Sequence, residues 1–313
     1  MQAAIEVSGL CKHYNGTRAL DGVSATVPAG QIIGLLGHNG AGKTTFLKLV
    51  LGLIQPTAGN VRVLGSSVGP ATRRQVHQRV GYLPESVTFY GNLTARETIS
   101  YVAGLKGRPV VEGVALLDRV GLAGVADKRV HTFSKGMRQR LGLAQALLGG
   151  PELLLFDEPT AGLDPIAILQ FLHLIGDLRA QGKTILISSH LLAELEAHLD
   201  RALVLSHGRV VTQGALTEMR DAADLPVIVR ARVDSGAQDV FGDPVFVVQA
   251  VRTETDGSAE FELEVPRSRK LDLIRRLVGI PGLADISVKE PSLPEIYARL
   301  SGGRRPARGE GHA

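Results

Sequence analysis

The stretch from Phe133 to Pro165 decides the fold: it reads FSKGMRQRLGLAQALLGG and then PELLLFDEPTAGLDP. In the first half a polar turn starts a helix, and in the second half an apolar strand ends in two adjacent acids. A glycine-rich loop, GHNGAGKT at Gly37–Thr44, lies well upstream. The loop alone indicates only that the chain binds a nucleoside triphosphate. Together, the two stretches indicate how that triphosphate is enclosed.

The glycine-rich loop fits the pattern G-x-x-x-x-G-K-[ST] at every fixed position. An apolar strand, QIIGLLG, runs into it, and TTFLKLVLGL follows with helical spacing, which is the context that the motif requires. Its glycines let the backbone aim N–H groups inward, and the following helix adds its positive dipole end. We expect Lys43 to reach the β- and γ-phosphates, and the hydroxyl of Thr44 to bind Mg²⁺. The expected nucleotide-binding residues of the loop are Gly37, His38, Asn39, Gly40, Ala41, Gly42, Lys43, Thr44 and Thr45.

Two adjacent acids end the strand LLLF. We expect the carboxylate of Asp157 to hold the Mg²⁺ shell. Glu158, one residue further, is expected to face the γ-phosphate and to deprotonate the attacking water. An alternative for Glu158 is that it caps the next helix. His190 follows the strand TILISS, where a histidine either senses the γ-phosphate or has a structural role.

Ser134 is a good N-cap for the helix KGMRQRLGLAQALL. With Gly136 close by, its hydroxyl and the first backbone N–H groups of the helix form a second anion site. Nothing nearer than the glycine-rich loop offers a phosphate to this site. One interpretation is that it faces the phosphates of another molecule.

The order of predicted elements divides the chain into two domains and a tail. Near-continuous apolar strands separated by helices predict a mainly parallel α/β sheet in residues 1–222, with a helical insertion at about 94–148. PVIVRARV, PVFVVQAV and AEFELEV then alternate apolar and polar residues, as half-exposed strands do. We expect a small α+β domain at 225–300 and a disordered basic tail at 301–313.

Composition narrows the class of protein. The 313 residues leave room for one large and one small domain, and the formal charge of +4 is mild and spread along the chain, so we expect no nucleic-acid partner. The single cysteine, Cys11, excludes an intramolecular disulfide and fits a reducing compartment. No signal peptide and no apolar run of the ~20 residues that a membrane helix needs is visible, so another chain would supply any membrane part.

These motifs and their order resemble the ATP-binding subunits of ATP-binding-cassette (ABC) transporters, over residues 1 to about 220. In that comparison Gly37–Thr44 matches the Walker A loop, LLLFDE matches Walker B with its catalytic glutamate, and FSKGM matches the signature. GLD, which ends in Asp164, matches the D-loop, and His190 matches the switch histidine. The resemblance implies a P-loop NTPase fold, with ATP and Mg²⁺ as cofactors.

The resemblance also implies partners. In the family two such subunits sandwich two ATP molecules head to tail, so Ser134 and Gly136 would act in trans on the ATP of a second copy. Tyr14 stands where the family stacks an aromatic ring on adenine. An integral membrane permease would be the other partner, and the chain would lie peripherally on the cytoplasmic face of the inner membrane.

The chain departs from the commonest family pattern at two places. Lys135 and Met137 replace the glycine and the glutamine of the usual signature LSGGQ, and Glu85 replaces the Q-loop glutamine. An ionised glutamate accepts hydrogen bonds but donates none, so its contact with Mg²⁺ or water would differ. Both variants resemble the export and multidrug-type subfamily, as does the segment PSLPEIY at Pro291–Tyr297.

A narrower likeness concerns four phrases: GHNGAGKTT, GYLPESVTFYGNL, TFSKGMRQRLGLAQALLG and EPTAGLDPIA. They resemble ATPase subunits of transporters that serve copper-site maturation of nitrous-oxide reductase, which would add a periplasmic maturation protein as a partner. The alternatives are an exporter of drugs, lipids or polysaccharides, a soluble ABC ATPase acting on ribosomes or DNA, and a regulatory ATP-binding module. No His/Cys/Met cluster with metal-ligand spacing is present, so a copper role rests on the resemblance alone.

Overall fold

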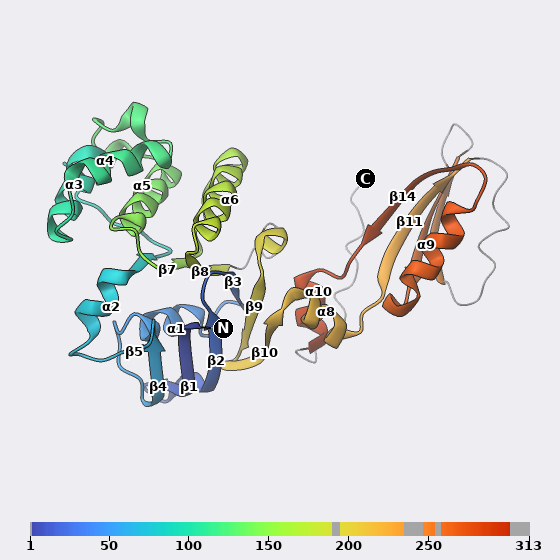
Figure 1. Cartoon of the computed structure of the whole chain (residues 1–313), viewed down its shortest axis with the longest axis horizontal. Helices are drawn as coiled ribbons and strands as arrows, with labels where there is room; N and C mark the ends of the chain where they lie inside the picture. Colours follow the sequence, from blue (N-terminus) through green and yellow to red (C-terminus); the bar gives the residue numbers. More distant parts are fainter. Residues whose placement is uncertain (1, 190–194, 235–246, 254–257, 301–313) are drawn as a thin grey trace. The chain divides into compact units, whose positions relative to one another are not determined.

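The structure, a computed structural model, describes residues 2–189, 195–234, 247–253 and 258–300 (Figure 1). The chain forms two compact units, Met1–Leu216 and Thr217–Ala313. The expected boundary lay between residues 222 and 225. Helix α8 (Leu216–Ala223) begins at the last residue of the first unit and continues in the second. Arg220 of α8 donates from Nε to the carbonyl of Pro291, also in the second unit, at 3.3 Å.

A six-stranded sheet, in the order β10-β9-β3-β8-β7-β6, carries the first unit. Its strands pair in parallel, except for β10, which is antiparallel to β9. Strands β3, β7 and β8 are buried throughout, which is why they are apolar without alternation. The strands are β3 (Ile32–Leu36), β6 (Val80–Leu83), β7 (Leu153–Asp157), β8 (Thr184–Ser189), β9 (Arg201–Ser206) and β10 (Arg209–Ala215).

A second, antiparallel sheet of the first unit has the order β2-β1-β4-β5. Its first two strands extend beyond the strands that the sequence predicts at residues 5–10 and from residue 23 onward. They pair along almost their whole length, from Ile5 opposite Val27 to Tyr14 opposite Thr17. The strands are β1 (Ala3–Tyr14), β2 (Thr17–Pro28), β4 (Ala58–Val63) and β5 (Ser66–Ser67). The apolar residues of this sheet share a core with α1 and the six-stranded sheet.

Helices of the first unit flank the sheets and form the insertion that the sequence suggested (Figure 1). The insertion consists of α3, α4 and α5. A capping box starts α3: Thr94 Oγ1 accepts from the N–H of Glu97 at 3.1 Å, and Glu97 accepts from the N–H of Thr94 at 2.8 Å. The helices are α1 (Lys43–Val50), α2 (Arg73–Arg79), α3 (Ala95–Leu105), α4 (Val110–Arg119), α5 (Lys135–Leu147) and α6 (Pro165–Ala180), with 3-10 turns η1 (Ala123–Val125), η2 (Val130–Thr132) and η3 (Glu196–His198).

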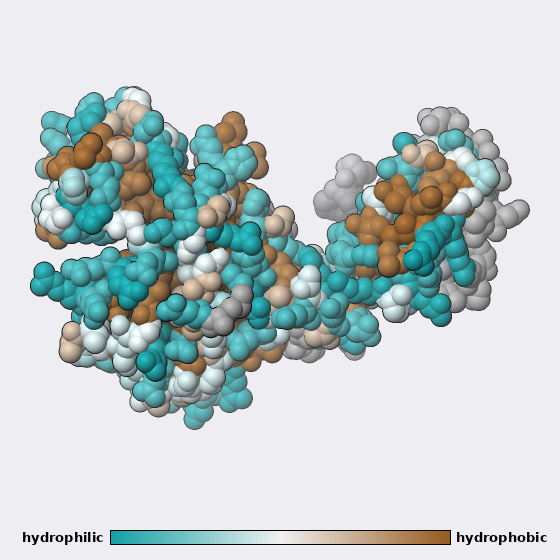
Figure 2. Space-filling model, in the orientation of Figure 1, coloured by the Kyte–Doolittle hydropathy of each residue, from teal (hydrophilic) through white to brown (hydrophobic). Residues whose placement is uncertain are grey.

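The second unit is a four-stranded antiparallel sheet, in the order β12-β13-β11-β14, with a helix on one face. Helix α9 buries Leu273 and Leu277 against the sheet, and the opposite face carries cross-strand ion pairs such as Arg230 with Glu262. Figure 2 shows hydrophobic residues gathered on one face of this unit. Its elements are β11 (Val227–Val233), β12 (Val247–Thr253), β13 (Ala259–Val265), η5 (Arg267–Arg269), α9 (Lys270–Val278), β14 (Leu283–Lys289) and α10 (Leu293–Leu300).

Within the described part of the chain, no helix combines the length and the apolar character that crossing a bilayer requires. The expected tail at 301–313 lies outside the described residues.

Candidate nucleotide-binding site

The glycine-rich loop joins β3 to α1, and its glycines are required by close packing. Gly37 has a φ of 152°, and a Cβ there would lie 2.4 Å from the carbonyl oxygen of Leu205. Gly42, which caps α1 with a φ of 106°, would bring a Cβ to 2.7 Å from the carbonyl oxygen of Ala19. Only glycine fits these positions, so the loop can wrap the N-terminus of α1.

Lys43 bends back over the loop. Its Nζ donates to the carbonyl of Gly37 at 2.7 Å and to that of His38 at 3.4 Å. The same ammonium lies 3.9 Å from Oε1 of Glu158, and both residues are buried. A buried lysine that faces the hollow of a glycine loop is placed to bind phosphate oxygens.

The hydroxyl and the carboxylate that we expect to hold Mg²⁺ are in contact. Thr44 Oγ1 donates to Oδ2 of Asp157 at 2.9 Å, and Ser188 Oγ donates to the other carboxylate oxygen. Asp157 is only 2% exposed. The two donor groups are hard oxygen ligands, so the residues present fit Mg²⁺. Thr44 lies in α1, Asp157 at the end of β7 and Ser188 near the end of β8. The parallel sheet brings these chain segments together at one edge.

Glu158 leaves β7 with a left-handed backbone, with a φ of 49°. Its N–H donates to the carbonyl of Ser188 at 3.1 Å, which fixes the turn. A positive φ at a residue with a Cβ costs about 1 kcal/mol or more and clusters at functional sites. Glu158 does not cap the next helix: Asp164 caps α6, with Oδ1 accepting from the N–H of Ala167 at 2.8 Å.

These residues line one cleft of about 540 Å³. Tyr14, which is 43% exposed, and Glu85 also line it. Thr17, Arg18 and Ala19 also line the cleft, although the sequence analysis did not single them out. They belong to no motif, and only their position shortly after Tyr14 could have indicated them. The lining residues are Tyr14, Thr17, Arg18, Ala19, His38, Asn39, Gly40, Gly42, Lys43, Thr44, Thr45, Glu85, Asp157 and Glu158.

A half-buried phenol, that of Tyr82 in β6, lies near the acids. Burial raises the pKa of Tyr82 to about 12, and the negative charges of Asp157 and Glu85 act in the same direction. The hydroxyl of Tyr82 is protonated at neutral pH, as an ordinary phenol is, and the raised pKa keeps it so into more alkaline solution. Tyr82 therefore adds no charge to the acidic end of the cleft.

The signature residues lie elsewhere. Ser134 caps α5, with Oγ accepting from the N–H of Met137 at 3.1 Å. Gly136 faces the loop before α6, since a Cβ there would lie 3.4 Å from the carbonyl oxygen of Gly162. Neither residue is among those that line the cleft. His190 lies outside the described residues.

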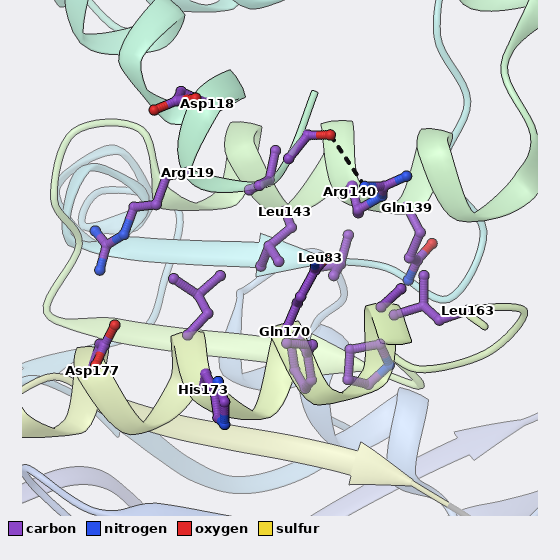
Figure 3. Close-up of a pocket in the computed structure, with 16 residues that line it drawn as sticks. Leu83, Asp118, Arg119, Gln139, Arg140, Leu143, Leu163, Gln170, His173 and Asp177 are labelled. Atoms are coloured by element: carbon purple, nitrogen blue, oxygen red, sulfur yellow. Dashed lines mark hydrogen bonds between the residues drawn. The ribbon is translucent and has the colours of Figure 1, made fainter. Parts of the chain in front are cut away.

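A second cavity, of about 320 Å³, opens between the helical insertion and α6 (Figure 3). Gln139 lines it from α5, and its buried Nε2 has no hydrogen-bond partner among the described residues. Arg140 Nη1 donates to the carbonyl of Gly121 at 3.2 Å across the top of the cavity (Figure 3). The cavity shows that the packing between the insertion and α6 is incomplete.

Comparison with known proteins decides the family. A family model described as ABC transporter matches residues 20–161. The bacitracin transport ATP-binding protein BcrA of Bacillus licheniformis is 34% identical over 307 residues, which cover 97% of this chain and 99% of that protein. The chain belongs to the ABC transporter ATP-binding protein family. A solved ATP-binding subunit of an ABC transporter matches this family member with a TM-score of 0.64 and 34% identity, over 70% of this chain and 92% of that one.

The predicted fold is therefore confirmed as an ABC cassette of the P-loop NTPase type. An uncharacterised ABC transporter ATP-binding protein of Nostoc is 46% identical over 208 residues, which cover 64% of this chain. The chain spans 61% of the length of that relative.

Proposed function

We propose that this ABC protein is the ATP-hydrolysing motor subunit of a transporter and powers a separate membrane permease. The observation that carries the proposal is the convergence of Lys43, Thr44, Asp157 and Glu158 on one cleft. Membership of the ABC family supports it.

The chemistry proposed for the cleft is transfer of the γ-phosphoryl group of ATP to water. Lys43 and the N–H groups of the loop bind the phosphates, while Thr44 and Asp157 supply the oxygen ligands for Mg²⁺. When bound, that ion neutralises charge that develops on the phosphates. Glu158 accepts the proton of the attacking water, a contribution of roughly 10²–10⁴ in rate.

Besides the permease, the proposed partner in ATP hydrolysis is another copy of the chain. Ser134 and Gly136 stand at the N-terminus of α5, outside the cleft of their own chain. Because Ser134 Oγ accepts from the N–H of Met137, its own O–H is available to donate to an anion. In an ATP-bound dimer these groups would bind the γ-phosphate of the second copy, and Asp164 would lie at the same contact.

The permease is proposed to dock on the face formed by the segment after Glu85 and by the helical insertion. A cleft of about 990 Å³ lies at one end of the insertion, between α2 and the turn after α3, and extends this face. Its cationic lining comes from the region of α2 and from the turn after α3, which favours an acidic segment of the partner. The cationic and titratable lining residues are Arg73, Arg74, His77, Lys106 and Arg108. The chain would then lie peripherally on the cytoplasmic face of the inner membrane.

The cargo is a finer proposal, with two candidates. The four phrases that resemble nitrous-oxide reductase maturation transporters favour copper-site maturation, with a periplasmic protein as a further partner. The name of BcrA, bacitracin transport, favours an exporter of an organic compound instead. Deletion of the gene separates them, because under the first proposal nitrous-oxide reductase would lose copper. Full copper content in the deletion strain would reject that candidate.

Substitution of Glu158 by Gln tests the motor proposal. We expect the variant to bind ATP, to lose at least about 10²-fold in turnover, and to accumulate as a dimer with ATP, because the amide accepts no proton. Glu152→Gln is the matched control, since Glu152 is an exposed partner of Arg79 outside the cleft. Turnover and size-exclusion chromatography with ATP measure both effects. Unchanged turnover in Glu158→Gln would reject the assignment.

A further inference from the structure

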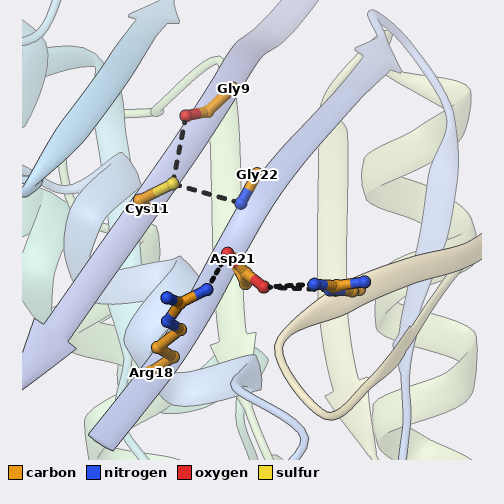
Figure 4. Close-up of polar contacts among 6 residues, drawn as sticks. Gly9, Cys11, Arg18, Asp21 and Gly22 are labelled. Carbon is orange, nitrogen blue, oxygen red and sulfur yellow. Dashed lines mark hydrogen bonds and ion pairs between the residues drawn. The ribbon is translucent and has the colours of Figure 1, made fainter. Parts of the chain in front are cut away.

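Arg18 lines the nucleotide cleft but belongs to none of the motifs that define it. It lies near the start of β2, and its side chain is 65% exposed. Its guanidinium is held weakly: Nη1 lies 3.5 Å from Oδ1 of Asp21 (Figure 4), at the outer limit of a hydrogen bond. An exposed pair of this kind contributes little to stability.

Asp21 keeps a stronger partner when Arg18 leaves. Arg209 donates to Oδ2 of Asp21 from Nε at 3.0 Å and from Nη2 at 2.6 Å. The hydrogen bond from Arg209 is the largest cause of the lowered pKa of the Asp21 carboxyl, with Arg18 contributing less. Two arginines, Arg18 and Arg209, thus share one carboxylate, that of Asp21. If Arg18 moves away, Asp21 stays paired with Arg209.

The backbone places Arg18 beside the phosphate-binding end of the cleft. The carbonyl of the next residue, Ala19, packs against the loop, since a Cβ at Gly42 would lie 2.7 Å from it. The same carbonyl packs against Gly208, where a Cβ would lie 2.8 Å away. Gly42 caps α1, whose first N–H groups face an incoming anion. Arg18 is thus anchored next to that helix end.

We propose that Arg18 is a nucleotide-binding residue that exchanges Asp21 for the phosphate chain when nucleotide enters. A guanidinium matches the geometry of phosphate oxygens and binds them in a bidentate manner. Arg18 belongs to the same β1–β2 hairpin as Tyr14, the residue expected at adenine. It would therefore contact the α- and β-phosphates, which lie nearer to the nucleoside than the γ-phosphate does. The inference rests on the proposed nucleotide site and adds a residue to it.

Equilibrium binding of ATP, ADP and adenosine to the full chain tests the proposal, with Mg²⁺ present and ATP measured in the Glu158→Gln background. We expect Arg18→Ala to weaken ATP and ADP about equally, by about 5–10-fold, and to leave adenosine unchanged. Arg18→Lys keeps the charge and should recover part of the loss. Arg62→Ala is the control, an exposed arginine of β4 that does not line the cleft.

Each outcome is decisive. Affinities of Arg18→Ala within twofold of the parent for ATP and ADP would overturn the proposal, as would an equal loss for adenosine, which would assign Arg18 to the nucleoside. Unchanged thermal unfolding of the nucleotide-free variant supports a binding role rather than a structural one. If the parent chain itself binds no ATP, the proposed function fails first, and that result is distinguishable from failure of Arg18 alone.

Discussion

Single residues at the cleft are held by contacts between distant parts of the sequence. Thr44 and Asp157 are separated by 113 positions, yet they share a hydrogen bond of 2.9 Å. Ser188, which is fully buried, links both acids: its hydroxyl donates to Asp157 and accepts from the N–H of Glu158 at 3.2 Å. Ser188 belongs to none of the motifs that the sequence analysis identified. We infer that its role is to position Asp157 and Glu158.

Replacing Ser188 by Ala tests this positioning role. We expect kcat for ATP hydrolysis to fall about 10-fold with little change in KM for ATP, because Ser188 orients the acids and does not line the cleft. Stability should fall by about 1–2 kcal/mol, since a buried carboxylate loses a donor. Steady-state kinetics and thermal unfolding measure these effects. A KM that rises while kcat holds would contradict a positioning role.

At the scale of elements, local sequence chemistry starts the helices of the insertion. Thr94 before α3 and Ser134 before α5 satisfy backbone N–H groups, and of these two caps the sequence analysis predicted Ser134. The cap of α6 shows the limit of such reasoning. Asp164 was identified from the sequence only by its match to the D-loop, whereas the structure also makes it the N-cap of α6.

The capping box of α3 offers a stability test at this scale. Thr94→Ala removes the hydroxyl that accepts from Glu97 and should destabilise the first unit by about 1 kcal/mol. Thr94→Ser keeps the hydroxyl and should retain most of that stability. The shift in the midpoint of thermal unfolding measures both variants. Equal midpoints for Ala and Ser would show that the box adds nothing.

At the scale of the whole molecule, the nucleotide cleft belongs entirely to the first compact unit. All of its lining residues lie between Tyr14 and Glu158, and the first unit extends to Leu216. The second unit has its own core between its sheet and α9. The two units therefore have separate interiors, and nucleotide binding should not require the second.

A fragment of residues 1–216 tests this independence. We expect it to fold and to bind ATP with an affinity within about twofold of the full chain, because no cleft residue is removed. Circular dichroism checks folding, and calorimetric titration with ATP measures affinity. A folded fragment that fails to bind ATP would show that the second unit contributes to the site.

The sequence by itself determined those elements and motifs that are encoded by the spacing of residues close together in the chain. It gave the strand, loop and helix around Gly37–Thr44, the buried strands, the acids at the end of LLLF and the alternating strands of the second unit, since periodicity and turn chemistry act over a few residues. It missed β6, because four residues with a glycine among them carry too short a pattern. It also underestimated β1 and β2, whose length depends on their pairing.

Only the tertiary structure decided which distant residues meet. Strand order in the parallel sheet brings Ser188 to Asp157, and hairpin packing against Gly42 brings Arg18 into the cleft. Ser134, at the start of α5, does not line the cleft of its own chain. Such contacts join residues far apart in the sequence, and their cause is the burial of whole strands and helices against one another, which no local pattern contains.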